Sequence, residues 1–403
     1  MLRSGIHLGR LFGIRITLDL SLIVIFVLVW FSLGAGAFPA WHPDWSPLLT
    51  WGLAAAAAVL FFLSILVHEL SHALVAKAYG IPVERITLFI FGGVANIEED
   101  PASPLHEAVM AGIGPVTSVG IGIACSFLAM LLSPTALPED PMLALQQMSP
   151  LVTLLAWLGP INILVGLFNL LPGFPLDGGR VLRALIWGIS KDLKLATRWA
   201  SRLGQAFGFA LIALGAAMAF GVVVPVLGGG LMQGIWLAFI GWFLNNAARL
   251  SYRQHLVREM LEDVPVWRLM RRESSPGVLA NEPISTLVHQ HLIARQQQAV
   301  VVYEGDRVAG IVEARDVRAI PRSEWETRPV SDVVRDLGTL PVLDPNLDMW
   351  RALRSFGRSK MALLPVRSQG QIVGMLHQAD VARFIDLQVN ELGRPGHGLP
   401  RET

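Results

Sequence analysis

The chain has 403 residues, of which 53% are hydrophobic and only 16% are charged. This balance is typical of a polytopic membrane protein that also carries soluble mass. The formal net charge of +1 gives no basis for nucleic-acid binding. Because Cys125 is the one cysteine, a disulfide framework and a cysteine metal cluster are excluded, and any metal must be held by His, Asp or Glu.

Apolar runs predict six transmembrane helices, each long enough to cross a hydrocarbon core of about 30 Å. The expected spans are residues 17–36, 49–79, 106–133, 151–172, 204–227 and 231–249. The first run follows Arg3, Arg10 and Arg15 and lacks a small-residue cleavage pattern. It is therefore expected to be a membrane helix rather than a cleaved signal peptide.

Basic residues in the connecting segments predict the orientation. Residues 37–48 and 134–150 contain no Lys or Arg, whereas the amino terminus, residues 173–203 and the segment after Arg249 are basic. The positive-inside rule therefore places both termini in the cytoplasm of a multi-pass cell-membrane protein.

The second run contains His68-Glu69-Leu70-Ser71-His72 toward its cytoplasmic end. On a helix, side chains at i and i+4 are about 40° apart in rotation and roughly 6 Å apart along the axis, so both imidazoles can face one ion. Glu69 falls beside that ion, where a carboxylate can act as a general base. Ionisable groups near the centre of a bilayer cost about 2.5–3.5 kcal/mol each and normally mark function.

A third metal ligand is expected because a catalytic zinc usually takes three from the protein. The candidate is Asp177 in Asn169-Leu-Leu-Pro-Gly-Phe-Pro-Leu-Asp177-Gly-Gly-Arg180, at the cytoplasmic end of the fourth run. Alone, an Asp before Gly-Gly is more often a turn or a helix cap. Together with the two histidines, it is interpreted as a ligand.

Residues 83–96, between the second and third runs, are rich in β-branched and aromatic side chains and contain Gly92-Gly93. They predict a strand or hairpin. Two interpretations stay open: a simple cytoplasmic hairpin, or an exposed strand edge beside the metal that pairs with an extended substrate.

After Tyr252 the composition becomes that of a soluble α/β domain with an internal repeat. Ala299–Val317 resembles Ala362–Val381, and Gly374 and Asp380 follow Gly310 and Asp316 by 64 positions. The expected organisation is a membrane domain at 1–250 with its catalytic core at 49–180, a linker at 251–257, repeats at 258–320 and 328–388, and a disordered tail at 389–403.

The HELSH motif, the later FGGVANIEEDPASP, the GPV at Gly114–Val116 and the NLLPGFPLDGGR segment together resemble the site-2 protease family of intramembrane zinc metallopeptidases. The resemblance covers roughly residues 1–250. It implies that His68, His72 and Asp177 bind one Zn²⁺ per chain. It also implies that Glu69 activates the water that attacks a peptide bond in or near a transmembrane segment of a membrane-protein substrate. Asn169 either polarises that peptide or caps a kinked helix.

The soluble repeats resemble a tandem pair of cystathionine-β-synthase-type (CBS) modules, a resemblance that implies regulation and an adenine nucleotide as a candidate ligand at Asp316 and Asp380. In nucleotide-binding members a Thr or Ser commonly stands three residues before the Asp, but Glu313 and His377 take those places in this chain. The two Asp residues are therefore equally interpretable as helix caps, and homodimerisation through the pair is an alternative role.

The fold predicted is thus a six-helix membrane protein with a short membrane-associated β-hairpin, followed by a cytoplasmic α/β CBS pair. The leading function is intramembrane proteolysis. The competing class is a CBS-regulated divalent-cation transporter lined by the same polar side chains, although no inverted repeat relates the six spans. An inactive scaffold that binds membrane proteins is disfavoured by the intact Glu69.

Overall fold

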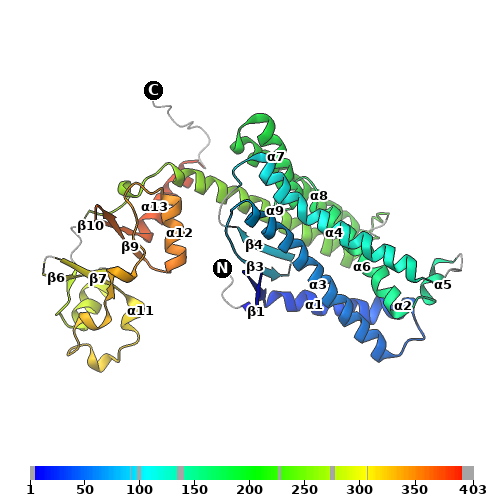
Figure 1. Ribbon diagram of the computed structural model, residues 1–403, viewed down its shortest axis with the longest axis horizontal. Helices are drawn as coiled ribbons and strands as arrows, with labels where there is room; N and C mark the ends of the chain where they lie inside the picture. The colour runs from blue at the N-terminus through cyan, green and yellow to red at the C-terminus, as the bar shows by residue number, and fades with distance from the viewer. Residues whose placement is uncertain are drawn as a thin grey trace. The chain divides into compact units, whose positions relative to one another are not determined.

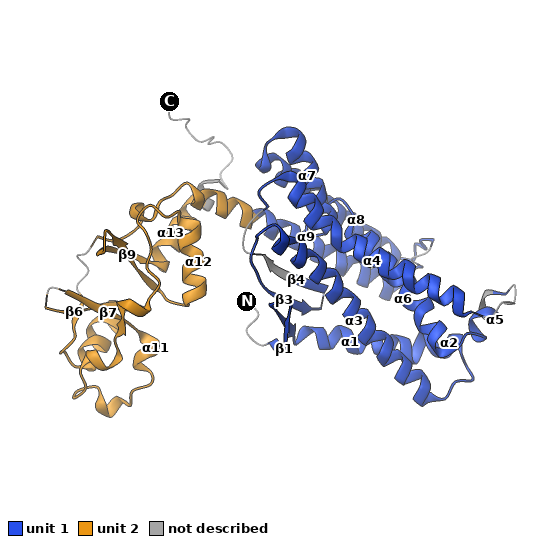
Figure 2. Ribbon diagram, in the orientation of Figure 1, with its two compact units in different colours: residues 1–252 blue, residues 253–403 orange. Residues whose placement is uncertain are grey.

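The computed structural model describes residues 5–90, 92–97, 101–133, 140–225, 228–272, 277–305 and 307–392. The chain divides into two compact units, residues 1–252 and residues 253–403 (Figure 2). The first unit holds the long helices and one small sheet, and the second is a smaller α/β unit.

Long helices dominate the first unit, and four short strands accompany them (Figure 1). Its elements are β1 (Gly5–Leu11), β2 (Ile14–Asp19), α1 (Ser21–Ser32), a π-helical turn (Leu33–Ala37), α2 (Phe38–Trp41), α3 (Pro47–Ala78), β3 (Val83–Phe89), β4 (Gly92–Ile97), α4 (Pro104–Leu132), α5 (Pro141–Gln146), α6 (Pro150–Asn169), α7 (Asp177–Ser190), α8 (Leu193–Ala219) and the part of α9 (Leu231–Glu262) up to Tyr252.

Three of the long helices begin in the same way. A serine precedes a proline at the start of α3, α4 and α6, and each serine hydroxyl accepts a hydrogen bond from a backbone N–H in the first turn. Proline suits the first helical position because its missing N–H would have no helical partner there. The dipeptides are Ser46-Pro47, Ser103-Pro104 and Ser149-Pro150.

The four strands form one sheet in the order β1-β2-β3-β4. β1 and β2 are antiparallel, β2 and β3 are parallel, and β3 and β4 are antiparallel. Buried Ile14, Ile16 and Ile86 on β2 and β3 pack with Ala73 and Ala76 of α3 in one core cluster. The sheet is therefore anchored to the helix that carries the histidine motif.

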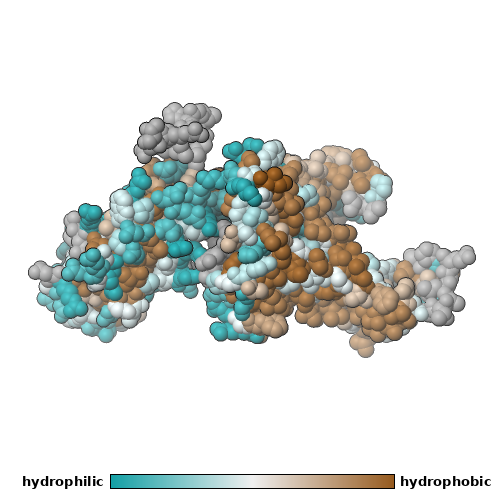
Figure 3. Space-filling view, turned by 45° about the horizontal axis from the view of Figure 1, so that its top comes forward, coloured by the Kyte–Doolittle hydropathy of each residue, from teal (hydrophilic) through white to brown (hydrophobic). Residues whose placement is uncertain are grey.

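Five described helical segments are long and apolar enough to cross a membrane, by length and composition: Ser21–Trp41, Pro47–Ala78, Pro104–Leu132, Pro150–Asn169 and Leu193–Ala219. Most of their residues are not buried inside the unit. Figure 3 accordingly shows a broad brown, apolar surface on the visible face of the first unit. Outward-facing apolar side chains suit contact with lipid rather than water. The protein is thus a multi-pass membrane protein.

Two expected span boundaries need correction. The first helix begins at Ser21 rather than at residue 17, because residues 5–19 pair as a hairpin whose turn, Phe12-Gly13, has positive φ at both positions. The fifth begins at Leu193 rather than at 204, because the Asp192 carboxylate accepts hydrogen bonds from two first-turn N–H groups. The basic segment 173–203 was expected to connect two spans, but it contains the helix α7.

The expected sixth span, 231–249, lies within α9. Gln233, Asn245 and Asn246 interrupt the apolar character of this helix. α9 does not belong to the five segments identified by length and apolarity among the described residues.

The second unit contains two similar strand pairs. Its elements are β5 (Val278–Leu279), α10 (Ile284–Thr286) continued by a π-helical turn (Leu287–Ile293), β6 (Ala299–Glu304), β7 (Arg307–Glu313), α11 (Ala314–Val317), β8 (Arg335–Asp336), α12 (Met349–Ser359), β9 (Leu363–Ser368), β10 (Gln371–His377), α13 (Gln378–Leu392) and 3-10 turns at Val266–Arg268, Arg322–Glu324, Val330–Val333 and Leu337–Thr339. β6 pairs with β7 and β9 pairs with β10, both antiparallel. These hairpins lie within the two similar stretches, Ala299–Val317 and Ala362–Val381. The repeat boundaries at 258–320 and 328–388 stay a prediction. The tail was expected at 389–403, but α13 continues through Leu392, so the expected start at 389 is wrong. Residues 393–403 lie outside the described residues.

Candidate metal centre

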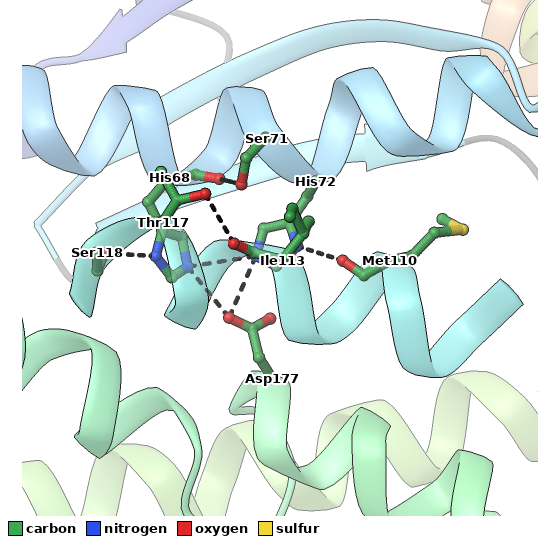
Figure 4. Close-up of polar contacts among 8 residues, drawn as sticks. All are labelled: His68, Ser71, His72, Met110, Ile113, Thr117, Ser118 and Asp177. Carbon is green, nitrogen blue, oxygen red and sulfur yellow. Dashed lines mark hydrogen bonds and ion pairs between the residues drawn. The ribbon is translucent and has the colours of Figure 1, made fainter. Parts of the chain in front are cut away.

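The two motif histidines lie on one face of α3 and are almost fully buried, with 4% and 5% of His68 and His72 exposed. Their Nε2 atoms are 3.2 Å apart. One helical turn separates the two residues, so the imidazoles meet side by side as expected for positions i and i+4. Both rings present the same kind of nitrogen to a common point (Figure 4).

Asp177 is brought to that point by the amino-terminal end of α7. Its Oδ2 lies 3.1 Å from Nε2 of His68 and 3.2 Å from Nε2 of His72. One ligand atom from each of the three residues lies within 4.8 Å of the other two. Two helices that are about a hundred positions apart in sequence therefore converge on one small volume (Figure 4).

Two glycines let the chain before α7 fold tightly enough to aim Asp177. A Cβ built on Gly178 would lie 2.2 Å from the carbonyl oxygen of Leu170, and one on Gly179 would lie 2.3 Å from the carbonyl carbon of Gly173. Real side chains do not tolerate such contacts with backbone. The Asp-Gly-Gly sequence thus provides both the carboxylate and the close backbone approach that positions it.

Helix α4 orients both imidazoles through hydrogen bonds at their Nδ1 atoms. Nδ1 of His72 donates to the carbonyl oxygen of Met110 at 2.5 Å, and Nδ1 of His68 is hydrogen-bonded to Oγ of Ser118 at 2.8 Å. With Nδ1 engaged on each ring, Nε2 is the nitrogen available to a cation. Gly114 lies between these two positions, and a Cβ there would lie 2.2 Å from Nε2 of His72 and 2.7 Å from Nε2 of His68.

Replacing Ser118 with alanine is expected to weaken zinc binding about 10-fold, because partners that orient a metal-binding imidazole typically contribute 10- to 100-fold in affinity. Competition with a chromophoric chelator measures this. Ser71→Ala is the matched control, since the Ser71 hydroxyl donates to the backbone carbonyl of His68 on its own helix instead of contacting an imidazole nitrogen. Equal zinc affinity of the two variants would contradict the role of Ser118.

Glu69 follows His68 on α3 and is half-buried. Its side chain lies against β4, where a Cβ built on Gly93 would lie 2.3 Å from Cγ and 3.1 Å from Oε1 of Glu69. Glu69 does not belong to the group of three ligand atoms found among the described residues. Glu69 therefore lies beside the cluster of three ligand atoms in sequence and against β4 in space.

The family resemblance implies that Glu69 is a general base, so a Gly93→Ala substitution is expected to lower kcat by about 10- to 100-fold. The new methyl group must push the Glu69 carboxylate aside, and misplacement by 1 Å can cost that much. Zinc content should stay at the wild-type value, since none of the three clustered side chains is touched. Steady-state cleavage and metal analysis of the same preparation test both statements. An unchanged kcat would show that Glu69 does not depend on this contact.

Asn169 is the last residue of α6 and is half-buried. The loop of residues 170–176 separates it from Asp177. The helix end it occupies leads directly into the loop that aims Asp177. Its expected contact with substrate stays a prediction.

In the second unit, the carboxylates of both repeat aspartates accept hydrogen bonds from arginines. Asp316 accepts from Nε of Arg335 at 3.0 Å and from the backbone N–H of Glu313 at 2.9 Å, in a capping box. Asp380 accepts from Nε and from Nη2 of Arg271, each at 2.7 Å. Arg271 holds the pKa of the Asp380 carboxyl below its usual range. Both carboxylates are thus engaged within the unit.

Two imidazoles and one carboxylate are the ligand set of a catalytic zinc site, and three protein ligands leave a coordination position for water or substrate. Both imidazoles are buried and are hydrogen-bonded through Nδ1, and Asp177 is half-buried. Gly114 has no side chain that would clash with the two Nε2 atoms. The residues present therefore fit a zinc ion.

This fold and this cluster define a multi-pass membrane protein with a candidate His-His-Asp metal centre at the meeting of α3, α4 and α7. The chain belongs to Peptidase family M50, whose sequence profile matches residues 56–215. This segment contains His68, Glu69, His72 and Asp177. Rip3 of Mycobacterium tuberculosis, which carries the name of a zinc metalloprotease, is 32% identical over 96% of this chain and 94% of its own length. The Synechocystis zinc metalloprotease sll0528, so named, is 30% identical over 95% of this chain and 96% of its own.

Among solved structures, a site-2 protease from Methanocaldococcus jannaschii is similar over 62% of this chain and 95% of its own, with 26% identity and a TM-score of 0.42. Membership of a peptidase family favours the protease over the alternative of a divalent-cation transporter.

Proposed function

We propose that this protein is an intramembrane zinc endopeptidase in which His68, His72 and Asp177 bind one zinc ion per chain. One observation carries the proposal: the ligand atoms of these three side chains lie within 4.8 Å of one another, on helices far apart in sequence. Membership of a peptidase family supports the activity, and the names of Rip3 and sll0528 support zinc as the metal.

When bound, zinc supplies Lewis-acid chemistry that polarises a carbonyl group and lowers the pKa of water to about 7. Glu69 takes a proton from the attacking water while the water oxygen bonds to the scissile carbonyl carbon. Glu69 then delivers that proton to the leaving nitrogen as the C–N bond breaks. Glu69 lies on α3 next to His68 and in contact with Gly93, a position that suits this transfer.

The substrate is a transmembrane segment of a membrane protein, which must be partly unwound because a helix hides its carbonyl groups. β4 supports this step, since it is the last strand in the order of its sheet and lies against Glu69. An opened substrate strand that pairs with β4, the outermost of the described strands, would recover backbone hydrogen bonds lost on unwinding. Asn169, at the end of α6, is proposed to hold the scissile peptide.

The expected topology is retained as part of the proposal. α9 supplies the sixth span through residues 231–249, and both termini lie in the cytoplasm. The positive-inside rule supports this orientation, because residues 37–48 and 134–150 lack Lys and Arg, whereas α7 and the first half of α8 carry several of these residues. The membrane domain comprises residues 1–250, and the soluble module follows a linker at 251–257.

The module comprises CBS-type repeats at 258–320 and 328–388 and regulates the peptidase. Homodimerisation is proposed as its mode of action, because Arg335 and Arg271 already occupy the Asp316 and Asp380 carboxylates that a nucleotide ribose would need. Buried Glu313 also accepts a hydrogen bond at 2.7 Å from the backbone N–H of Ala362 in the other repeat. Analytical ultracentrifugation of the full chain with and without ATP separates the two roles.

The test of the proposed function uses protein purified in detergent and incubated with single-span membrane proteins. Chelation should stop cleavage, and restoring zinc should recover it, whereas His68→Ala protein should stay inactive with zinc present. Products that persist in the His68→Ala sample, or cleavage that survives removal of all zinc, would refute the assignment. Zinc flux into liposomes without proteolysis would support the transporter instead.

A further inference from the structure

A buried ion pair joins α4 to α7 close to the metal centre but outside it. Glu107, in the first turn of α4, is fully buried, and 8% of Arg183 on α7 is exposed. Nε of Arg183 donates to Oε1 of Glu107 at 2.6 Å, and Nη2 contacts the same oxygen. Removing two charges from water is costly, so a buried ion pair contributes little net stability. The pair between Glu107 and Arg183 therefore calls for a reason other than stability.

The position of Glu107 on α4 indicates that reason. Glu107, Met110, Gly114 and Ser118 follow one another at helical spacings of three and four, so they share one face of α4. The same face that contacts the imidazoles therefore also carries the acidic end of the pair. α4 fixes His68 and His72, whereas α7 carries Asp177.

Arg183 also contacts the loop that leads into Asp177. Its guanidinium carbon lies 5.5 Å from the centre of the Phe174 ring, and Phe174 is buried, with 6% exposed. A planar guanidinium can donate hydrogen bonds to a carboxylate from its edge while its face lies against an aromatic ring. One side chain thus links α4, α7 and the loop of residues 170–176.

We propose that Glu107 and Arg183 are positioning residues that set the Asp177 carboxylate at the level of the two imidazoles. The inference rests on the proposed function, in which these three side chains bind zinc. The carboxylate belongs to α7, whereas the imidazoles belong to α3 and are oriented by Met110 and Ser118 of α4. The 3.1 Å and 3.2 Å separations therefore depend on the spacing of α4 and α7. A charged contact with short, directional hydrogen bonds holds that spacing better than apolar packing.

The test compares single and double variants in the full-length protein purified in detergent. Glu107→Gln and Arg183→Gln each leave one buried charge without its partner and should lower the melting temperature of the metal-free protein. The double variant removes both charges and should recover most of that loss. Its zinc affinity should nevertheless stay about 10-fold below wild type, because the amides cannot reproduce the short guanidinium–carboxylate contact.

Cobalt substitution gives a second measurement, since the visible absorption of bound Co²⁺ reports ligand geometry without any need for proteolysis. The double variant and Arg183→Lys, which keeps the charge but loses the planar contact, should both show a changed spectrum. Arg183→Lys is a milder change, so it keeps the test valid if the glutamine variants fail to fold.

Thr153→Val is the matched control. It breaks the 2.8 Å hydrogen bond from Thr153 to buried His42, near the start of α3 and roughly 30 Å along that helix from His68. It should lower the melting temperature without changing zinc affinity. Wild-type zinc affinity and cobalt spectrum in the double variant and in Arg183→Lys would overturn the proposal. So would zinc affinity that falls with melting temperature in every variant, Thr153→Val included. Neither outcome depends on whether the protein proves to be a peptidase.

Discussion

Glu69→Gln protein is expected to bind one zinc ion per chain and yet to cleave substrate about a thousandfold more slowly than wild type. Glutamine keeps the shape of the side chain, so the contact with Gly93 and the arrangement of the three clustered residues should persist. The amide cannot accept a proton, and a positioned general base contributes about 10²- to 10⁴-fold. Single-turnover cleavage with metal analysis of the same sample measures both quantities.

The zinc measurement decides how a loss of cleavage is interpreted. If Glu69→Gln protein loses zinc as well, Glu69 acts as a ligand, and the three-ligand set would be wrong. If it keeps zinc and still turns substrate over at the wild-type rate, another group takes the proton, and Glu69 would be excluded as the general base. Glu69→Ala alone could not separate these cases, because it also leaves space beside Gly93.

The three side chains proposed as metal ligands can be predicted from sequence because metal-binding chemistry leaves a pattern. His68 and His72 are spaced by four on a helix, and Asp177 is predictable from its depth at the end of another apolar run. The groups that orient them leave no pattern. The partner of His72 is a backbone carbonyl, and Ser118 is one hydroxyl in an apolar helix. Glu107 and Ser118, at helical spacing on either side of Gly114, are the one signal that could have indicated this face.

The fold shows a similar limit. Helices α3, α4 and α6 are predictable to within a few residues because Ser-Pro dipeptides mark their starts. The β1–β2 hairpin escapes prediction because its second strand, Ile14–Asp19, merges in sequence with the apolar run of α1. Its pairing with β3 joins segments about seventy positions apart, and periodicity within one segment carries no information on such a partner.

Gly114→Ala is expected to abolish zinc binding and, with it, proteolysis. The added methyl carbon would lie 2.2 Å from Nε2 of His72 and 2.7 Å from Nε2 of His68, the two atoms that must face the metal. The rings cannot both retreat without breaking their contacts with Met110 and Ser118. We therefore expect zinc affinity to fall by more than about 100-fold, beyond the usual effect of losing one orienting partner.

Gly112→Ala supplies the control on the same helix, because a Cβ there meets nothing within 4 Å. Replacing glycine by alanine inside a helix favours the helix by about 1 kcal/mol, so neither variant should lose α4 for want of helix propensity. Gly112→Ala should keep wild-type zinc affinity and cleavage. Tight zinc binding by Gly114→Ala would mean that the metal does not lie between α3 and α4, and the His-His-Asp centre would have to be placed elsewhere.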